Sequence, residues 1–408
     1  MIASAPTFSQ RAVDETAARL GHATLGYLIA ITLVITLSPF HFAWTPVHGF
    51  TYNWQDRFDI AMNMVMFVPL GFMFRLTRPR GIGAPWWHSL LLGAALSVII
   101  ETVQLFEATR FSSLVDIAAN IAGAGLGAWC VTVVTRRLRV GVDAVRILAL
   151  ELPLMGLAYL LVPLCWLVGL ASGGTSRAWL VLPIAACGGA ILGAIHGGYL
   201  EPVKRFSRTG LLVAGGAWFA VAVLPGTVNR LELVVAGVAV TLGSAWLRSV
   251  ATAHQRAQGG DRRFELPTLR LVLPLFVAYL ALSSLWPLSA LGSTWHAGIA
   301  LLLPGVEVKD AQVYLTLEHV AAFTLVGYVA AEFYGRADTP YSAVAWRVSG
   351  SGLLLGALLE IARGWHAQFG ASLLLGLFAV AASVFGGWMY HLQRDYVRAL
   401  LGYVPPEP

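Results

Sequence analysis

Twelve apolar runs follow one another along this chain, and each is about as long as a membrane is thick. A helix needs about 20 apolar residues to cross a hydrocarbon core about 30 Å thick. Charged residues make up only 12% of the chain, too few to cover a soluble fold, where about 25% is usual. We therefore expect an all-α polytopic membrane protein of about twelve transmembrane helices. The expected spans are 24–44, 59–76, 88–106, 116–135, 145–169, 178–196, 209–225, 231–248, 269–287, 317–335, 346–363 and 370–391.

The basic residues lie in the short segments between these runs and indicate how the chain is threaded. With the N-terminus inside, 21 of the 27 Lys and Arg residues fall in cytoplasmic segments. This bias predicts a multi-pass membrane protein with both termini in the cytoplasm. The first run is too long for the core of a signal peptide, so we expect it to remain as a span. The net charge of +6 does not indicate nucleic-acid binding, because the basic residues form no patch with interleaved aromatic residues.

Two parts of the chain share a spacing of residues and look like copies of one four-helix unit. Both copies begin on the same side, so the expected repeat is parallel. The matched elements are Asn63-x3-Phe67-x3-Gly71 with His319-x3-Phe323-x3-Gly327, Gly93 and Glu101 with Gly352 and Glu360, and Gly127 with Gly386. The second copy has lost most polar positions: Arg363, Phe369, Leu375 and Ala379 stand where the first has Gln104, Arg110, Asp116 and Asn120.

These features predict a division of the chain into six parts. A four-helix central segment lies between the two copies, and the polar stretch with Gly259 and Gly260 is typical of a linker. The predicted parts are a cytoplasmic N-terminal segment 1–23, a first four-helix unit 24–140, the central membrane segment 141–248, a cytoplasmic linker 249–268, a degenerate second unit 269–391 and a cytoplasmic tail 392–408.

Polar side chains gather at the outer ends of three helices of the first unit. A charged group at mid-membrane costs about 2.5–3.5 kcal/mol on insertion scales, so such residues need a reason. Each of the three helices carries two of these polar residues, spaced three or four residues apart, so the two lie on one face of their helix. We expect an outward-facing pocket in which Glu101 and Asp116 are candidate catalytic residues. The candidate substrate-binding residues are Arg110, Gln104, Asn120, Asp59 and Asn63.

Other interpretations of these residues stay open. Glu101 can pair with Arg110 and lock the helices together, and Asp59 or Asp116 can stabilise a helix N-terminus. Asn63 and Asn120 can serve as hydrogen bonds between helices. The three cysteines lie in apolar runs without CxxC spacing, and no metal-binding spacing is present, so we expect neither a metal nor another cofactor.

The combined pattern resembles the VanZ-like family of bacterial membrane proteins. The residues that carry it are Asp59-x3-Asn63-x3-Phe67-Val-Pro-Leu-Gly71-Phe, Glu101-x2-Gln104-x5-Arg110 and Asp116-x3-Asn120-x2-Gly123-x3-Gly127. The resemblance covers 24–135 well and 269–391 in degenerate form. It implies a cell-envelope role, in a family named for low-level resistance to a glycopeptide antibiotic and found in envelope and exopolysaccharide contexts, without a settled reaction.

Three functions fit these observations. The first is an envelope protein that binds or modifies a lipid-linked or headgroup substrate at the outer face. The second is a twelve-helix transporter or lipid flippase, and the third is a scaffold of an envelope or exopolysaccharide assembly complex. The expected partners are membrane lipid, a lipid-linked envelope precursor and envelope-assembly proteins, with no nucleic acid. Whether the chain is an enzyme stays open.

Overall fold

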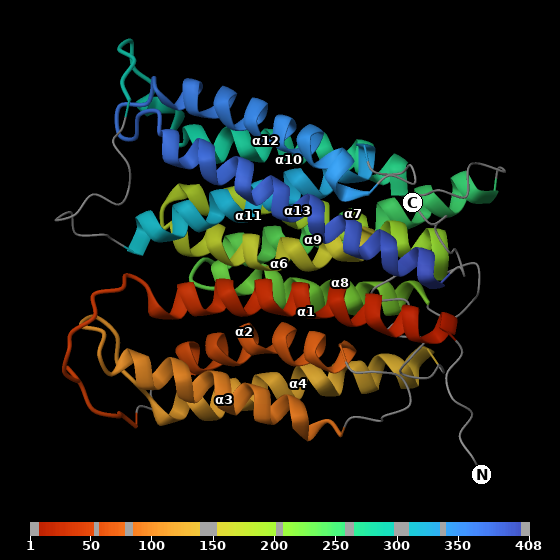
Figure 1. Cartoon of the computed structure of the whole chain (residues 1–408), viewed down its shortest axis with the longest axis horizontal. Coiled ribbons are helices and arrows are strands. Elements are labelled where there is room, and N and C mark those ends of the chain that lie inside the picture. The colour runs from red at the N-terminus through yellow and green to blue at the C-terminus, as the bar shows by residue number, and fades with distance from the viewer. Residues whose placement is uncertain are drawn as a thin grey trace. The chain divides into compact units, whose positions relative to one another are not determined.

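The fold is all-α and polytopic, as the sequence predicts (Figure 1). The computed structural model describes residues 8–52, 57–77, 85–138, 153–200, 207–257, 265–297, 310–334 and 340–400. Eleven helical segments among these residues are long and apolar enough to cross a membrane. The helices are α1 (Phe8–Leu37), α2 (Arg57–Leu76), α3 (Trp87–Gln104), α4 (Leu114–Leu138), α6 (Pro153–Ala171), α7 (Val181–Ile195), α8 (Arg208–Ala222), α9 (Leu231–Ala257), α10 (Glu265–Leu285), α11 (Asp310–Tyr334), α12 (Tyr341–Arg363) and α13 (Leu373–Leu400).

Several helix ends differ from the expected spans. The first helix stops at Leu37 rather than near residue 44, because Pro39 lacks a backbone N–H and disfavours helical geometry in the residue before it. Helix α8 has only 15 residues and is too short to be a candidate span. Helix α9 continues to Ala257, so part of the expected linker is helical. The start of the span at 145–169 and the apolar stretch 299–303 lie outside the described residues.

The chain forms two compact units. Unit 1 comprises residues 1–153 and 392–408, and unit 2 comprises residues 154–391. Unit 1 contains α1–α4 and the end of α13, whereas unit 2 contains the central helices α6–α9, the helices α10–α12 and α13 as far as His391. The finer six-part division stays a prediction.

Close backbone contact holds α2 against α4 in unit 1. A Cβ atom on Gly71 would collide with the carbonyl of Ala124. A Cβ atom on Gly123 or Gly127 would collide with the carbonyl of Met64 or Val68. Small residues at such positions let helices approach closely, which is the main source of helix packing energy in lipid. Pro69 lies inside α2, and the helix runs past it to Leu76.

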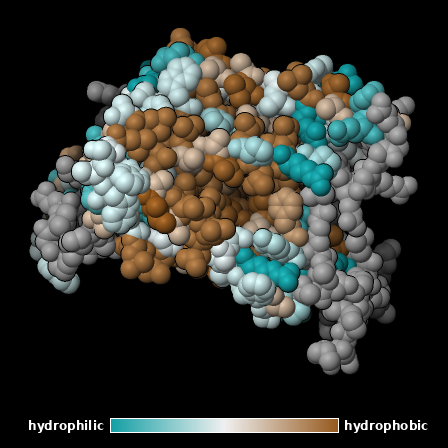
Figure 2. Space-filling view, turned by 90° about the horizontal axis from the view of Figure 1, so that it is seen from above, coloured by the Kyte–Doolittle hydropathy of each residue, from teal (hydrophilic) through white to brown (hydrophobic). Residues whose placement is uncertain are grey.

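Apolar side chains dominate the surface drawn in Figure 2. Trp129, Leu247 and Leu373 are exposed although they are large and apolar. A soluble protein rarely exposes apolar residues in such numbers, whereas lipid solvates them without cost. The surface thus agrees with a membrane-embedded fold.

Candidate functional site

A backbone clamp closes one end of unit 1. This end, where α1 and α3 finish and α2 and α4 begin, is called the polar end here. The segment after α1 lies along the α3–α4 connection and is fixed to it by main-chain hydrogen bonds. The bonds are Ala43 N–H to the Phe106 carbonyl (2.7 Å), Val47 N–H to Leu105 (2.8 Å), Ala108 N–H to His41 (3.1 Å) and Thr51 N–H to Ser112 (2.8 Å). The segment after α1 and the α3–α4 connection together form an ordered layer over the helix ends, which is called the cover below.

Glu101 lies beneath this cover at the end of α3 and is only 2% exposed. Its Oε2 accepts a hydrogen bond of 2.7 Å from the Ser113 N–H. Its own carbonyl accepts one of 2.7 Å from the Ser112 hydroxyl. These two bonds tie Glu101 to the residues just before α4, so Glu101 fixes the entry into that helix.

Gln104 and Asn120 also bond to other helices of unit 1. The Gln104 Nε2 donates to the Thr36 carbonyl on α1 over 2.8 Å. The Asn120 Nδ2 donates to the Ser97 hydroxyl on α3 over 2.8 Å. These contacts correspond to the interhelical interpretation of the two amides. Each side chain also keeps a buried amide oxygen without a hydrogen-bond partner in the described part of the chain.

The remaining candidates lie nearer the surface of the polar end. Asp59 is exposed in the first turn of α2, while Asn63 and Asp116 are half-buried. Both aspartates lie within electrostatic range of Glu101. Arg110 is half-buried in the connection, and its Nε donates to the Ser38 carbonyl over 2.9 Å. The structure therefore brings three carboxylates to this end and places Arg110 in its cover.

Glu107 is a buried carboxylate that the sequence did not single out. It is fully buried, its Oε1 accepts from the His41 N–H (3.1 Å), and its Oε2 accepts from the Thr109 N–H (2.7 Å) and hydroxyl (2.9 Å). In the sequence it stands in a short polar stretch between two spans, where burial is not expected. The clamp is what buries it. No signal in the sequence marks it as buried.

The order of these elements and the polar set on them are those expected from the resemblance noted above. Residues 7–135 match the family model of VanZ/LLP1. The resemblance is thus confirmed for α1–α4, which we call the VanZ-like unit. No curated protein and no solved structure matches the chain.

The contacts of the VanZ-like unit have counterparts in α10–α13. The Glu360 Oε2 accepts from the Ser372 N–H over 2.7 Å, as Glu101 does from Ser113. Gly327 and Gly386 each meet a backbone carbonyl closely, as Gly71 and Gly127 do. The clamp bonds also recur: Gly292 N–H to the Trp365 carbonyl (2.7 Å), His296 N–H to Gly364 (2.9 Å) and Ala367 N–H to Ala290 (2.9 Å).

His366 occupies the place in the second clamp that Glu107 has in the VanZ-like unit. It is fully buried, and its Nδ1 accepts from the Gln368 N–H over 3.2 Å. Burial, together with the charges of Arg363 and His296, lowers the pKa of His366, although a backbone contact with Pro287 acts the other way. Its neutral form is thus the one that stabilises the clamp.

We expect this histidine to make unit 2 less stable in acid. The stabilisation is complete above the ordinary histidine pKa of about 6.5 and is lost as the pH falls from there through the lowered value. His366→Asn retains an acceptor for Gln368 and removes the titration. Thermal unfolding in detergent between pH 8 and pH 5 should show a shallower pH dependence in this variant than in the wild type. His22→Asn, at an exposed position on α1, should leave the slope unchanged. Equal slopes for all three proteins would contradict the assignment.

A bidentate ion pair lies inside unit 2. The Arg177 Nη1 and Nη2 donate to the two carboxylate oxygens of Glu318 over 2.8 and 2.9 Å. The Tyr279 hydroxyl donates to Glu318 Oε1 over 2.6 Å, and all three side chains are buried. In the sequence Glu318 lies within an apolar run, and nothing there indicates Arg177 as its partner.

Proposed function

We propose that this chain is a cell-envelope protein of the bacterial inner membrane whose VanZ-like unit binds a lipid-linked or headgroup substrate at its polar end. The polar end then faces outward, and both termini lie in the cytoplasm. The family match and the membrane-type helices support the general part of this proposal. The specific part rests on one observation, the gathering of Asp59, Glu101 and Asp116 at the polar end.

The contacts divide the polar residues into two groups with different roles. Glu101, Gln104 and Asn120 bond to other parts of unit 1 and hold its frame. Asp59 and Asp116 are more exposed than these three, so a hydroxyl or ammonium group of a headgroup can approach their carboxylates. A guanidinium such as that of Arg110 suits a phosphate. A headgroup with a phosphate and a hydrogen-bond donor fits this combination.

Asp116→Asn is expected to weaken headgroup binding while the protein still folds. Phosphatidylethanolamine is the probe, because it carries both a phosphate and an ammonium group. Native mass spectrometry should show the wild type preferring it to phosphatidylcholine, and the variant losing about tenfold in affinity, the low end of the range for one hydrogen bond to a charged group. Asp59→Asn should have a smaller effect, because Asp59 is the more exposed of the two.

Two variants serve as controls. Glu101→Gln keeps an acceptor for the Ser113 N–H and should fold and bind as the wild type does. Glu232→Gln, at an exposed position in unit 2, should change nothing. If Asp116→Asn binds both lipids like the wild type, the proposed site is wrong. If a cellular activity disappears in Glu101→Gln while binding persists, Glu101 is catalytic.

A scaffold is the second candidate function, and a specific observation favours it. At least four of the seven polar residues bond within unit 1, and the clamp fixes the described segment after α1 to the α3–α4 connection. An ordered cover of this kind suits docking of an envelope-assembly protein. Loss of such a partner on substitution of surface residues of the cover, with headgroup binding unchanged, would favour this function over the first.

We also propose that α10–α13 are a second, diverged copy of the VanZ-like unit. The shared spacing of residues and the matched clamp bonds support this proposal. The second copy has no counterparts of Asp116 and Asn120, so the headgroup site proposed here belongs to the first copy alone.

A further inference from the structure

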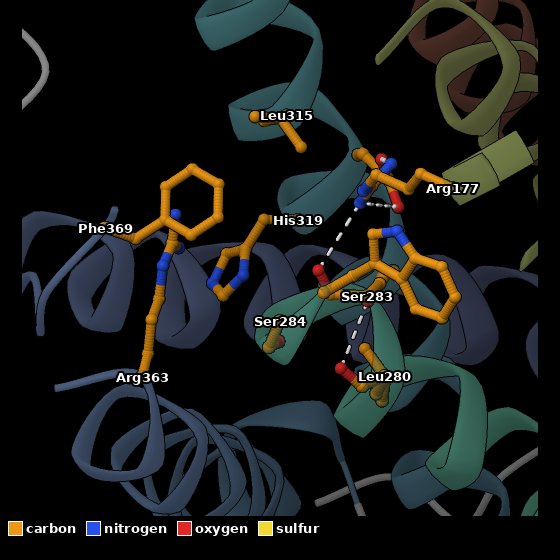
Figure 3. A pocket seen from close by; sticks show the side chains of 11 residues that line it. Arg177, Leu280, Ser283, Ser284, Leu315, His319, Arg363 and Phe369 are labelled. Carbon is orange, nitrogen blue, oxygen red and sulfur yellow. Dashed lines mark hydrogen bonds and ion pairs between the residues drawn. The ribbon is translucent and has the colours of Figure 1, made fainter. Parts of the chain in front are cut away.

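A pocket in unit 2 brings two arginine side chains together (Figure 3). It opens to the surface, and polar and apolar side chains both line it. Arg363, His319 and Phe369 lie on one side of it, and Arg177 lies on the other. The two guanidinium groups are within electrostatic range of each other.

The two arginines differ in how closely a carboxylate group approaches their guanidinium charge. Both terminal nitrogens of the Arg177 guanidinium donate hydrogen bonds to the Glu318 carboxylate. The nearest carboxylate oxygen to Arg363 is Glu360 Oε1, 3.7 Å from its Nη1, while the other oxygen of Glu360 accepts from Ser372. The Arg363 Nε is buried without a hydrogen-bond partner in the described part of the chain. A guanidinium offers five donors, and its contact with Glu360 at 3.7 Å is longer than an ordinary hydrogen bond.

The surroundings hold Arg363 toward the pocket. Its guanidinium carbon lies 4.8 Å from the centre of the Phe369 ring, and this cation–π contact fixes the side chain without using its donors. His319 is fixed by a 3.0 Å bond between Nε2 and the Leu375 carbonyl. Ser284 adds a hydroxyl to the lining.

The lining also indicates what kind of molecule carries the anion. Leu280, Leu315 and Trp286 line the same pocket as the arginines. They belong to the last turns of α10, the second turn of α11 and the residue after α10, so the pocket opens where α10 ends and α11 begins, and it extends along α11 as far as Ala322. At such a depth a phospholipid places its phosphate next to the start of its acyl chains.

From these observations we infer that this pocket binds a phosphate group through Arg363, with Arg177 as the second cation. The inference concerns other residues than the headgroup site of the VanZ-like unit and does not depend on it. The phosphate belongs to a membrane phospholipid, because apolar side chains share the lining. Free phosphate would use the same donors but not the apolar wall.

Native mass spectrometry of the full chain in detergent tests the inference with three probes. Phosphatidylglycerol carries the phosphate and the chains, diacylglycerol carries only the chains, and inorganic phosphate carries only the anion. We expect phosphatidylglycerol to bind the wild type well above diacylglycerol. Arg363→Gln should lower its affinity about tenfold, because the lost bonds are charge-assisted. Phosphate that displaces the lipid at millimolar concentration would confirm that the anion is what the site recognises.

Two further variants separate ligand binding from folding. Arg347→Gln removes an exposed arginine from the same helix, α12, and should bind phosphatidylglycerol like the wild type. Leu315→Trp keeps every charged group and fills the pocket, so it should also weaken binding. Binding of phosphate alone, without preference for the lipid, would keep the site and replace its source by a soluble anion. Wild-type affinity in folded Arg363→Gln or Leu315→Trp would overturn the inference.

Discussion

Glu318→Gln should destabilise unit 2 by about 3–5 kcal/mol, the usual cost of removing one partner of a buried ion pair. The variant leaves the buried Arg177 without a carboxylate and removes the charge that the Tyr279 hydroxyl contacts. Unfolding of the purified protein in mixed micelles should show the loss as a lower midpoint. Tyr279→Phe should cost less, about 1.5–3 kcal/mol, because it removes one hydrogen bond to a charged group.

A double variant distinguishes the value of the ion pair from the penalty of breaking it. Replacing a whole buried pair by apolar residues is often neutral or stabilising. Arg177→Met combined with Glu318→Leu should therefore recover much of the stability that Glu318→Gln loses. Glu232→Gln is the matched control, because this glutamate is exposed at the start of α9. A Glu318→Gln variant as stable as Glu232→Gln would show that the pair contributes nothing.

Gly71→Ala should separate α2 from α4 and destabilise the VanZ-like unit by about 1–3 kcal/mol, the usual cost of overpacking. The new Cβ atom would overlap the backbone carbonyl of Ala124, and a backbone atom cannot turn aside as a side chain can. Gly71→Val should cost more, since its branched side chain adds further atoms at the same contact. Thermal unfolding in detergent, followed by size-exclusion chromatography, measures both effects.

Gly26→Ala is the control for this series. Gly26 also lies in a helix, α1, but a Cβ atom there would meet nothing within 4 Å. Alanine has the higher helix propensity, so this variant should be neutral or more stable by up to about 1 kcal/mol. If Gly71→Ala and Gly26→Ala behave alike, the close contact between α2 and α4 does not limit stability.

The sequence predicted the fold because the apolar runs indicate which helices lie in lipid, and the basic segments indicate which parts of the chain lie in water between them. It predicted Glu101 as important because an acid in an apolar run needs a partner. It could not identify that partner, because the partner is the backbone N–H of Ser113, and a backbone group does not depend on which side chain the residue carries. Arg177 and Glu318 are 141 positions apart, and only the packing of the helices brings them together.

The clamp of the VanZ-like unit is made mainly of bonds between main-chain atoms, and the corresponding bonds in α10–α13 join residues of different kinds. Main-chain bonds are indifferent to which side chains the residues carry. Mutations can therefore change the chemistry of the cover while its shape persists. A four-helix frame built this way can carry its cations at different places: Arg110 stands in the connection of the VanZ-like unit, and Arg363 stands at the end of α12.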